Sequence, residues 1–154
     1  MFKSSCQIFA ITTALWLCGC GGSSTTPTPS QASLVFTATP NPVPSSGLGT
    51  SCVGTLAKTW VWIWNIRNTG NATFTVASFQ NTYQVPGAAP IVIQGTPNDF
   101  IVLYGTSVIA PNASVQATVC VGLTNPPATT VTHTSVLVGQ SGESFTTPTV
   151  QLLP

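Results

Sequence analysis

The side chains best suited to acid–base or nucleophilic chemistry are scarce in this chain of 154 residues. It contains one histidine, His133, and two carboxylates, Asp99 and Glu143. A catalytic serine needs a general base and a third group that orients the base. The sequence contains no Gly-x-Ser-x-Gly turn, no phosphate-binding glycine loop and no His/Glu spacing typical of a metal site. We therefore expect no catalytic activity, no metal and no cofactor.

The cysteines near the N-terminus indicate a different chemistry, the acylation of a thiol. Lys3 precedes an apolar stretch over residues 8–17, which has the length of an export signal and not the roughly 20 residues of a membrane span. The stretch ends in Leu17-Cys18-Gly19-Cys20, which resembles the lipobox of bacterial lipoproteins. The resemblance implies cleavage before Cys20 and a lipid on its sulfur. Cys18 is the alternative acceptor of the lipid, but cleavage before Cys18 would put bulky side chains at positions where the signal peptidase prefers small ones. The other alternative is an ordinary secretion signal with incidental cysteines.

The residues that follow Cys20 indicate a tether and then a single domain. Residues 21–30 read GGSSTTPTPS and contain no large apolar side chain, so this segment cannot bury enough surface to fold. We expect a signal peptide over residues 1–19, the lipidated cysteine and tether over 20–31, and one domain over 32–154. By resemblance to Gram-negative lipoproteins, Gly21 in place of aspartate favours the outer membrane of a bacterial envelope.

The expected domain carries very little charge. Lys58, Arg67, Asp99 and Glu143 are its only charged residues, two of each sign. Such a surface provides almost no field to attract a nucleic acid or a phosphorylated ligand. The partners that we expect are the membrane, through the N-terminal lipid, and an unidentified protein or polysaccharide.

The thiols of the expected domain are Cys52 and Cys120. Export brings the chain into an oxidising compartment, where a pair of thiols usually forms a disulfide. Because 68 positions separate the two residues, this bond would contribute about 4 kcal/mol in the chain-entropy model. The alternatives are two free buried thiols, or a metal site in which His133 supplies the third and last ligand.

The chain beyond the tether has the composition of an all-β protein. It is rich in Val, Ile, Thr, Phe and Trp, and Gly, Pro and Asn occur at short intervals, as is typical of a sandwich or a barrel. We expect 7–9 strands, and no stretch shows the apolar spacing and caps of a helix. The predicted strands cover residues 33–39, 59–67, 72–80, 90–94, 100–104, 114–121, 132–138 and 144–152, with a weaker one over 52–57.

Three tryptophans lie on one side of a predicted strand. Trp60, Trp62 and Trp64 alternate with other residues, and side chains alternate across a strand. Buried Trp commonly anchors sandwiches, so we interpret the row as core. The alternative is a stacking platform for sugar rings. Trp60, nearest the end of the strand, is the one that we expect to be partly exposed, and it is the candidate ligand-binding residue.

A second strand has a similar apolar side. In residues 115–121 the Val and Ala side chains face away from Gln116, Thr118 and Cys120. We expect this apolar side to meet the tryptophan row across the sandwich, with the two strands in different sheets.

Several segments resemble a known group of bacterial modules. Residues 64–76, WNIRNTGNATFTV, resemble the strand, turn and strand signature of immunoglobulin-like modules of the ASPM/SPD-2/Hydin type and of choice-of-anchor surface modules. Residues 109–119 resemble their later valine-rich strand, with Asn112 where glycine is usual, and residues 134–138 resemble their penultimate strand. The resemblance implies an immunoglobulin-like antiparallel β-sandwich that binds, spaces or assembles.

These observations predict a lipid-anchored envelope protein with a non-catalytic binding or assembly role. The alternative is a carbohydrate-binding module that uses the Trp60, Trp62 and Trp64 row as its platform. An enzyme would need a site that the sequence does not reveal.

The disulfide can be tested by thiol labelling. If Cys52 and Cys120 are joined, the mature protein denatured without reductant should react with no maleimide at either position, and both should react after reduction. Mass spectrometry of the labelled peptides reports each cysteine separately. Labelling of both residues before reduction would show that the bond does not form.

Overall fold

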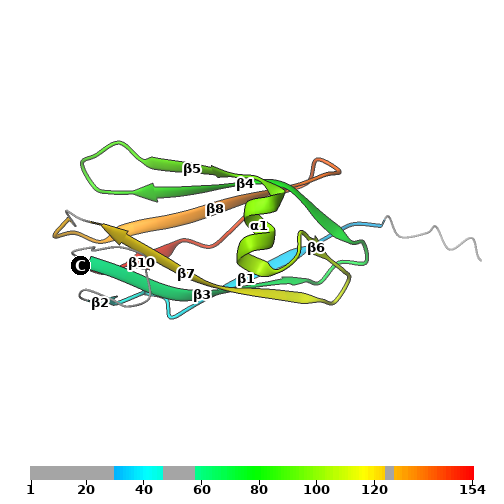
Figure 1. Ribbon diagram of the computed structural model, residues 1–154, viewed down its shortest axis with the longest axis horizontal. Coiled ribbons are helices and arrows are strands. Elements are labelled where there is room, and N and C mark those ends of the chain that lie inside the picture. Colours follow the sequence, from blue (N-terminus) through cyan, green and yellow to red (C-terminus); the bar gives the residue numbers. More distant parts are fainter. Residues whose placement is uncertain (1–29, 47–57, 124–126) are drawn as a thin grey trace, which may run out of the picture.

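The computed structural model describes residues 30–46, 58–123 and 127–154. Within these ranges ten strands and one helix are present, and the strands form two antiparallel sheets packed face to face (Figure 1). The predicted all-β, antiparallel sandwich is confirmed. The number of strands exceeds the expected 7–9 because two of them, β2 (Ser45–Ser46) and β6 (Val108–Ile109), are only two residues long.

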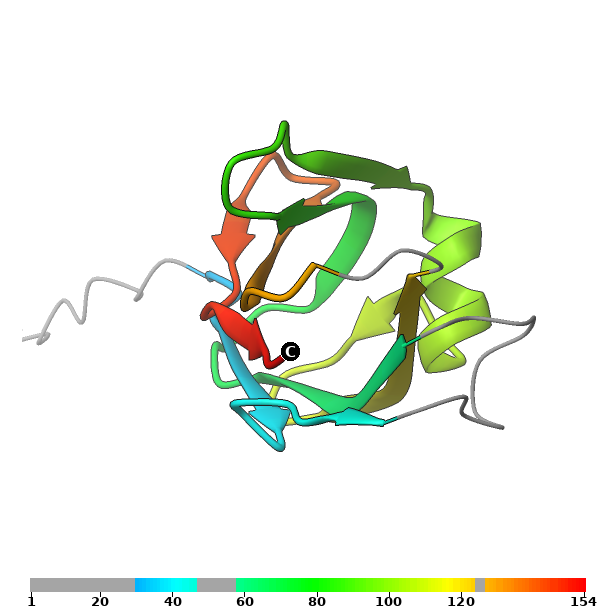
Figure 2. The same ribbon diagram turned by 90° about the vertical axis from the view of Figure 1, so that its left-hand side faces the viewer.

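The first sheet is built on β3 (Lys58–Asn68). Strand β1 (Leu34–Thr39) and the short β2 pair with one edge of β3, and β7 (Ser114–Leu123) pairs with the other. Figure 2 views the molecule along its long axis and shows this sheet as a separate layer from the second.

The second sheet is built on β4 (Phe74–Gln84) and β8 (Val131–Gly139), which are neighbours. Strands β9 (Ser144–Thr146) and β10 (Val150–Leu152) pair with the outer edge of β8. Strand β5 (Ile91–Gly95) and the short β6 pair with β4. The predicted strand over residues 144–152 is therefore two strands, and Pro148, which has no N–H to donate to a ladder, lies in the break.

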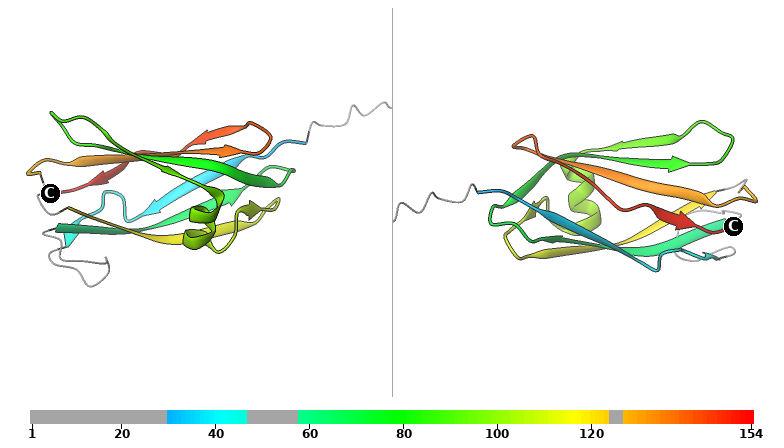
Figure 3. Two further views of the ribbon diagram at one scale, coloured as in Figure 1. Left: turned by 45° about the horizontal axis from the view of Figure 1, so that its top comes forward. Right: turned by 180° about the vertical axis from the view of Figure 1, so that it is seen from behind.

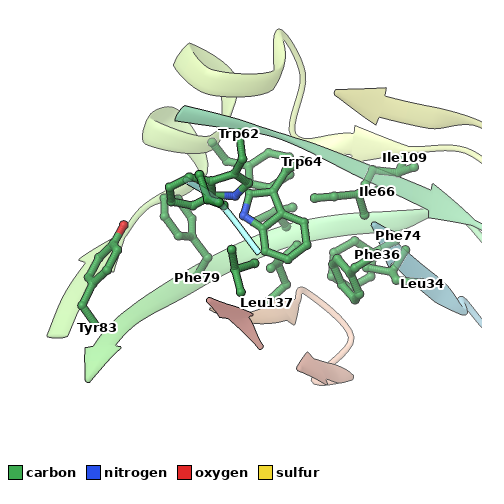
Figure 4. Packing of buried hydrophobic residues seen from close by; sticks show 14 of the residues in the cluster. Leu34, Phe36, Trp62, Trp64, Ile66, Phe74, Phe79, Tyr83, Ile109 and Leu137 are labelled. Carbon is green, nitrogen blue, oxygen red and sulfur yellow. The ribbon is translucent and has the colours of Figure 1, made fainter. Parts of the chain in front are cut away.

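The tryptophan row forms the centre of the core, as predicted. Trp60, Trp62 and Trp64 are 0, 1 and 3% exposed, whereas Ile63 on the other face of β3 is 37% exposed. Figure 4 shows Trp62 and Trp64 among Phe79 and Leu137, which come from the opposite sheet. The expectation that Trp60 is partly exposed is wrong. Its indole N–H donates a hydrogen bond of 2.6 Å to the carbonyl of Leu153, which gives a buried polar atom its partner.

The expected placement of the second apolar strand is also wrong. Strand β7 is the direct neighbour of β3, and Trp62 lies opposite Val119 in the ladder. The apolar sides of the two strands therefore lie next to each other on one sheet and together face β4 and β8. Alternation identifies which side of a strand is buried, but it carries no information about the sheet to which the strand belongs.

Asn68, at the end of β3, is fully buried and uses all of its hydrogen-bonding capacity. Its side-chain oxygen accepts from the N–H of Ser33 at 3.2 Å and from that of Gly70 at 3.0 Å. Its amide nitrogen donates to the carbonyls of Ala72 at 2.7 Å and Ile109 at 3.0 Å. One side chain thus joins the start of β1, the β3–β4 turn and β6, which lie in both sheets.

Residues 100–104 were predicted to form a strand and instead belong to the helix α1 (Pro97–Tyr104). Thr96 is the N-cap, and its hydroxyl and the Asp99 carboxylate each bond the other residue's backbone N–H to form a capping box. Pro97 occupies the first turn, where its missing N–H costs nothing, and Gly105 ends the helix at φ 78°. These terminal signals outweigh the β propensity of the apolar run between them.

Helix α1 packs against β4, β5 and β7 and so bridges the two sheets along one side of the sandwich (Figure 3). Phe100 is buried there, with its ring 6.0 Å from that of Phe79 and 4.2 Å from that of Tyr104. No helix in the described ranges has both the length and the apolar character needed to cross a bilayer. The weak strand expected over residues 52–57 lies outside these ranges.

Truncation of the tryptophan row tests its role as core. Trp62→Ala should lower the free energy of unfolding by about 3–5 kcal/mol, because it removes a large buried ring and leaves a cavity. Ile63→Ala, on the more exposed side of the same strand, should lower it by about 1 kcal/mol or less, the range of β propensity. Urea unfolding followed by circular dichroism measures both. Equal stability of the two variants would contradict the assignment of faces.

Candidate functional site

The residues singled out in the sequence fall into two groups, those that the structure describes and those outside the described ranges. Cys20 and Cys52 lie outside the described ranges, so lipidation and the Cys52–Cys120 disulfide stay predictions. Cys120 lies on β7, opposite Val61 in the ladder with β3. Within the described ranges, no three His, Cys, Asp or Glu side chains come together as metal ligands. The sugar-stacking platform loses its basis here, because all three indoles of the row are buried.

His133, on β8, is buried in an aromatic environment. It is 1% exposed, and its ring centroid lies 4.7 Å from that of Tyr83 and 5.3 Å from that of Trp62. Its Nε2 lies 3.3 Å from the Ser135 hydroxyl, which donates its own proton to the Asn81 side-chain oxygen at 2.5 Å. With the Ser135 proton on Asn81, the tautomer that satisfies this contact carries its hydrogen on Nε2, and Nδ1 has no partner in the described part of the chain.

In this arrangement the hydrogen bond between serine and histidine runs in the opposite direction to that between a catalytic serine and its base. A base must accept the serine proton through an unprotonated ring nitrogen. Here the nitrogen next to Ser135 is a donor, and the serine proton already goes to Asn81. Burial lowers the pKa of His133 to about 4, so the ring is neutral at neutral pH. We interpret the cluster as a buried polar network of the core.

Two hollows lie between the sheets on the side where β4 and β5 face β7. One, of about 110 Å³, is lined by His133, Ser135 and Tyr83 and is bordered by α1 through Phe100 and Tyr104. The other, of about 390 Å³, lies between the first residues of β5 and the last residues of β7. Its described lining is mainly aliphatic and includes Val85, Ile91, Ile93, Val121 and Leu123. The wider hollow is therefore mainly apolar, whereas the narrower one is lined in part by the polar residues around His133.

The surface of the same side carries an unusual group of exposed aliphatic residues. We call it the aliphatic face and define it by three consecutive residues of β5 and three of α1, two elements that contact each other. Val102 is 85% exposed, and the other five are between 41 and 50% exposed. Its members are Ile91, Val92, Ile93, Ile101, Val102 and Leu103. Side chains alternate along β5, so Ile91 and Ile93 line the wider hollow and Val92 points to the outer side of the sheet. Groups of exposed apolar side chains mark interaction sites in soluble proteins.

The aliphatic face carries almost no charge. Asp99 is the only charged residue of β5 and α1, and its carboxylate accepts bonds from the Thr96 hydroxyl at 2.6 Å and the Thr96 N–H at 2.8 Å. These bonds lower the pKa of Asp99, the hydroxyl contributing most, and keep the charge at the helix N-terminus. The face therefore favours an uncharged partner surface over a polyion.

The aliphatic face is not among the sites predicted from the sequence. Residues 90–94 and 100–104 were both interpreted as ordinary strands, and a strand with one solvated side should alternate apolar and polar residues. Ile91-Val92-Ile93 does not alternate, and Phe100 to Tyr104 is apolar throughout. This lack of alternation is the signal in the sequence that points to a surface with a further partner.

Comparison with known proteins supports the fold alone. No protein-family model and no curated protein matches the chain. A solved structure of the putative ApaA protein from Bordetella pertussis is similar, with a TM-score of 0.52 and 18% identity over 80% of this chain and 95% of that one. A structural genomics target, SoR45, gives a TM-score of 0.51 and 16% identity over 79% of this chain and 86% of that one. At these identities the two structures show a shared sandwich and carry no function to this chain.

The buried histidine should make stability depend on pH. The unfolded chain takes up a proton near pH 6.5, whereas folded His133 does so only near pH 4, so stability is complete above pH 6.5 and is lost as the pH falls. The loss between pH 7 and pH 4 should be about 3 kcal/mol. Urea unfolding at both pH values measures it, and His133→Phe is the control that should lack this part of the loss. An equal loss in His133→Phe would show that another group is responsible.

Proposed function

We propose that this protein is held on a bacterial envelope membrane by lipid at Cys20 and has a non-catalytic binding or assembly role there. The observation that carries the binding role is the aliphatic face, which presents six exposed aliphatic side chains on two contacting elements. The lipid anchor rests on the Leu17-Cys18-Gly19-Cys20 pattern.

Two further features support a binding role over a catalytic one. His133 is buried in the core, with its Nε2 next to the Ser135 hydroxyl. The Asp99 carboxylate is engaged in the helix cap. Among the described residues, the surface that differs most from an ordinary solvated one is therefore the apolar aliphatic face. It provides contact area for a macromolecule and few groups for a chemical reaction.

Membrane attachment also suits a surface of this kind. A domain with almost no net charge and an exposed apolar face tends to associate without specificity when it diffuses freely. Two or more acyl chains hold a protein stably in one bilayer. Attachment then restricts the encounters of the aliphatic face to partners in the same envelope layer.

The proposal is tested with the full chain expressed in a bacterial host. Washed membranes are solubilised in a mild detergent, and the protein is detected on a native gel. The parent should be found in the membrane fraction and should migrate as a complex larger than the monomer. Cys20→Ala should leave the membrane fraction or accumulate uncleaved.

Charged substitutions separate the aliphatic face from the rest of the surface. The double variant Val92→Asp and Val102→Asp should migrate as a monomer, because burying either carboxylate in an apolar interface is unfavourable. The matched control is Val35→Asp and Ile63→Asp, at exposed positions of the other sheet, which should migrate like the parent. A monomeric parent, or equal migration of both double variants, would refute a binding role for this face.

A further inference from the structure

We propose that a second copy of this chain binds along the outer edge of β5, antiparallel to it, so that the two second sheets join into one continuous sheet. This inference rests on the proposed function and names the partner of the aliphatic face. It follows from the position of β5, its sequence and its charge.

Strand β5 is an edge. In the described ranges it pairs with β4 alone and ends the strand order of its sheet. The backbone groups on the outer side of such a strand point away from the sheet and can bond another strand of the same kind. Figure 2 shows β5 at the border of its layer, with α1 beside it.

The residue pattern of β5 differs from that of the edge strands of the first sheet. Natural edge strands usually carry charged residues, a proline or a bulge that discourages further pairing. On β7, one edge of the first sheet, Gln116 and Thr118 are exposed, and on β1, another edge, buried and exposed residues alternate over the first four positions. On β5 no residue between Ile91 and Gly95 is charged or proline, and Ile91, Val92 and Ile93 are 45, 48 and 50% exposed. Strands that are covered on both faces have this continuous β-branched pattern.

The sequence of β5 is self-complementary. Two identical strands that pair antiparallel are related by a twofold axis, which is the symmetry of most homodimers. With the axis at Val92, this residue meets Val92 of the second copy, and Ile91 meets Ile93 of the second copy. All three are pairs of β-branched residues, which stabilise neighbouring strands.

This surface carries too little charge for repulsion between like charges to oppose such pairing. Like charges that lie directly opposite each other destabilise a pair of strands. The single charge of β5 and α1, Asp99, is engaged in the helix cap at one end of this surface. A lipid bilayer suits the surface less well, because helices that lie on membranes carry Lys or Arg beside their apolar side chains, and α1 carries neither.

Cross-linking of single cysteine variants tests the pairing in the full chain, in intact cells. Val92→Cys should give a product of twice the chain mass with a short bifunctional maleimide, because the axis brings the two thiols together. Val35→Cys is the matched control, since Val35 is also 48% exposed and lies on an edge strand of the other sheet. The Val35→Cys variant should give no more cross-linked product than the parent. The product from the parent measures how much cross-linking comes from the native cysteines.

A charge exchange then shows whether the contact is between identical copies. Val92→Lys and Val92→Glu should each remove the dimer when expressed alone, since like charges then meet at the axis. Co-expression of the two should restore a mixed dimer, which a general loss of folding would not allow. Val35→Lys should leave the dimer intact.

The outcomes separate this inference from the proposed function. Equal cross-linking of Val92→Cys and Val35→Cys, or no dimer from single cysteines at any position from 91 to 94, would overturn pairing along β5. If the parent still forms a complex that the aspartate variants of the aliphatic face disrupt, the partner is a different molecule and the proposed function stands. If the parent is monomeric, both fail.

Discussion

The burial of three indoles on one side of β3 is the constraint on which the rest of the structure depends. Since side chains alternate, placing Trp60, Trp62 and Trp64 between the sheets sends Val61 and Ile63 to the outer side. A slip of one residue against β1 or β7 would bring all three rings into water, so the register of both ladders is determined by this strand. The opposite sheet then has to supply matching apolar surface, which it does mainly from β4 and β8.

The same core explains why the surface next to α1 is apolar. The space between the sheet edges is filled from the side by Phe100, whose ring packs between those of Phe79 and Tyr104. Gly95 leads into the helix directly against the Phe79 ring, where a side chain would not fit. A helix directs successive side chains around its whole circumference, so an apolar run of five residues cannot all face inward. Burial of Phe100 therefore accompanies exposure of the aliphatic residues that follow it.

How far the sequence predicts this molecule depends on the range of the interactions involved. Alternation correctly assigned the buried side of β3, and turn residues located most of the strands. The sheet to which β7 belongs and the partner of Trp60 were missed, because both depend on segments far along the chain. Helix α1 was missed for a different reason: its capping residues Thr96 and Asp99 were present, but β-branched composition was given more weight. The aliphatic face was missed with it, since exposure is decided by packing.

The hydrogen bond between Trp60 and Leu153 has a consequence for how the chain folds. Its two ends are 93 positions apart. At a rate of synthesis of roughly 5–20 residues per second, the indole row is made about 5–20 s before the residues that close its end of the core. During this interval the Trp60 end of the core is open, and non-local pairing of this kind is intrinsically slow. Folding of the domain therefore depends on keeping an aromatic strand from aggregating until its last residues are in place.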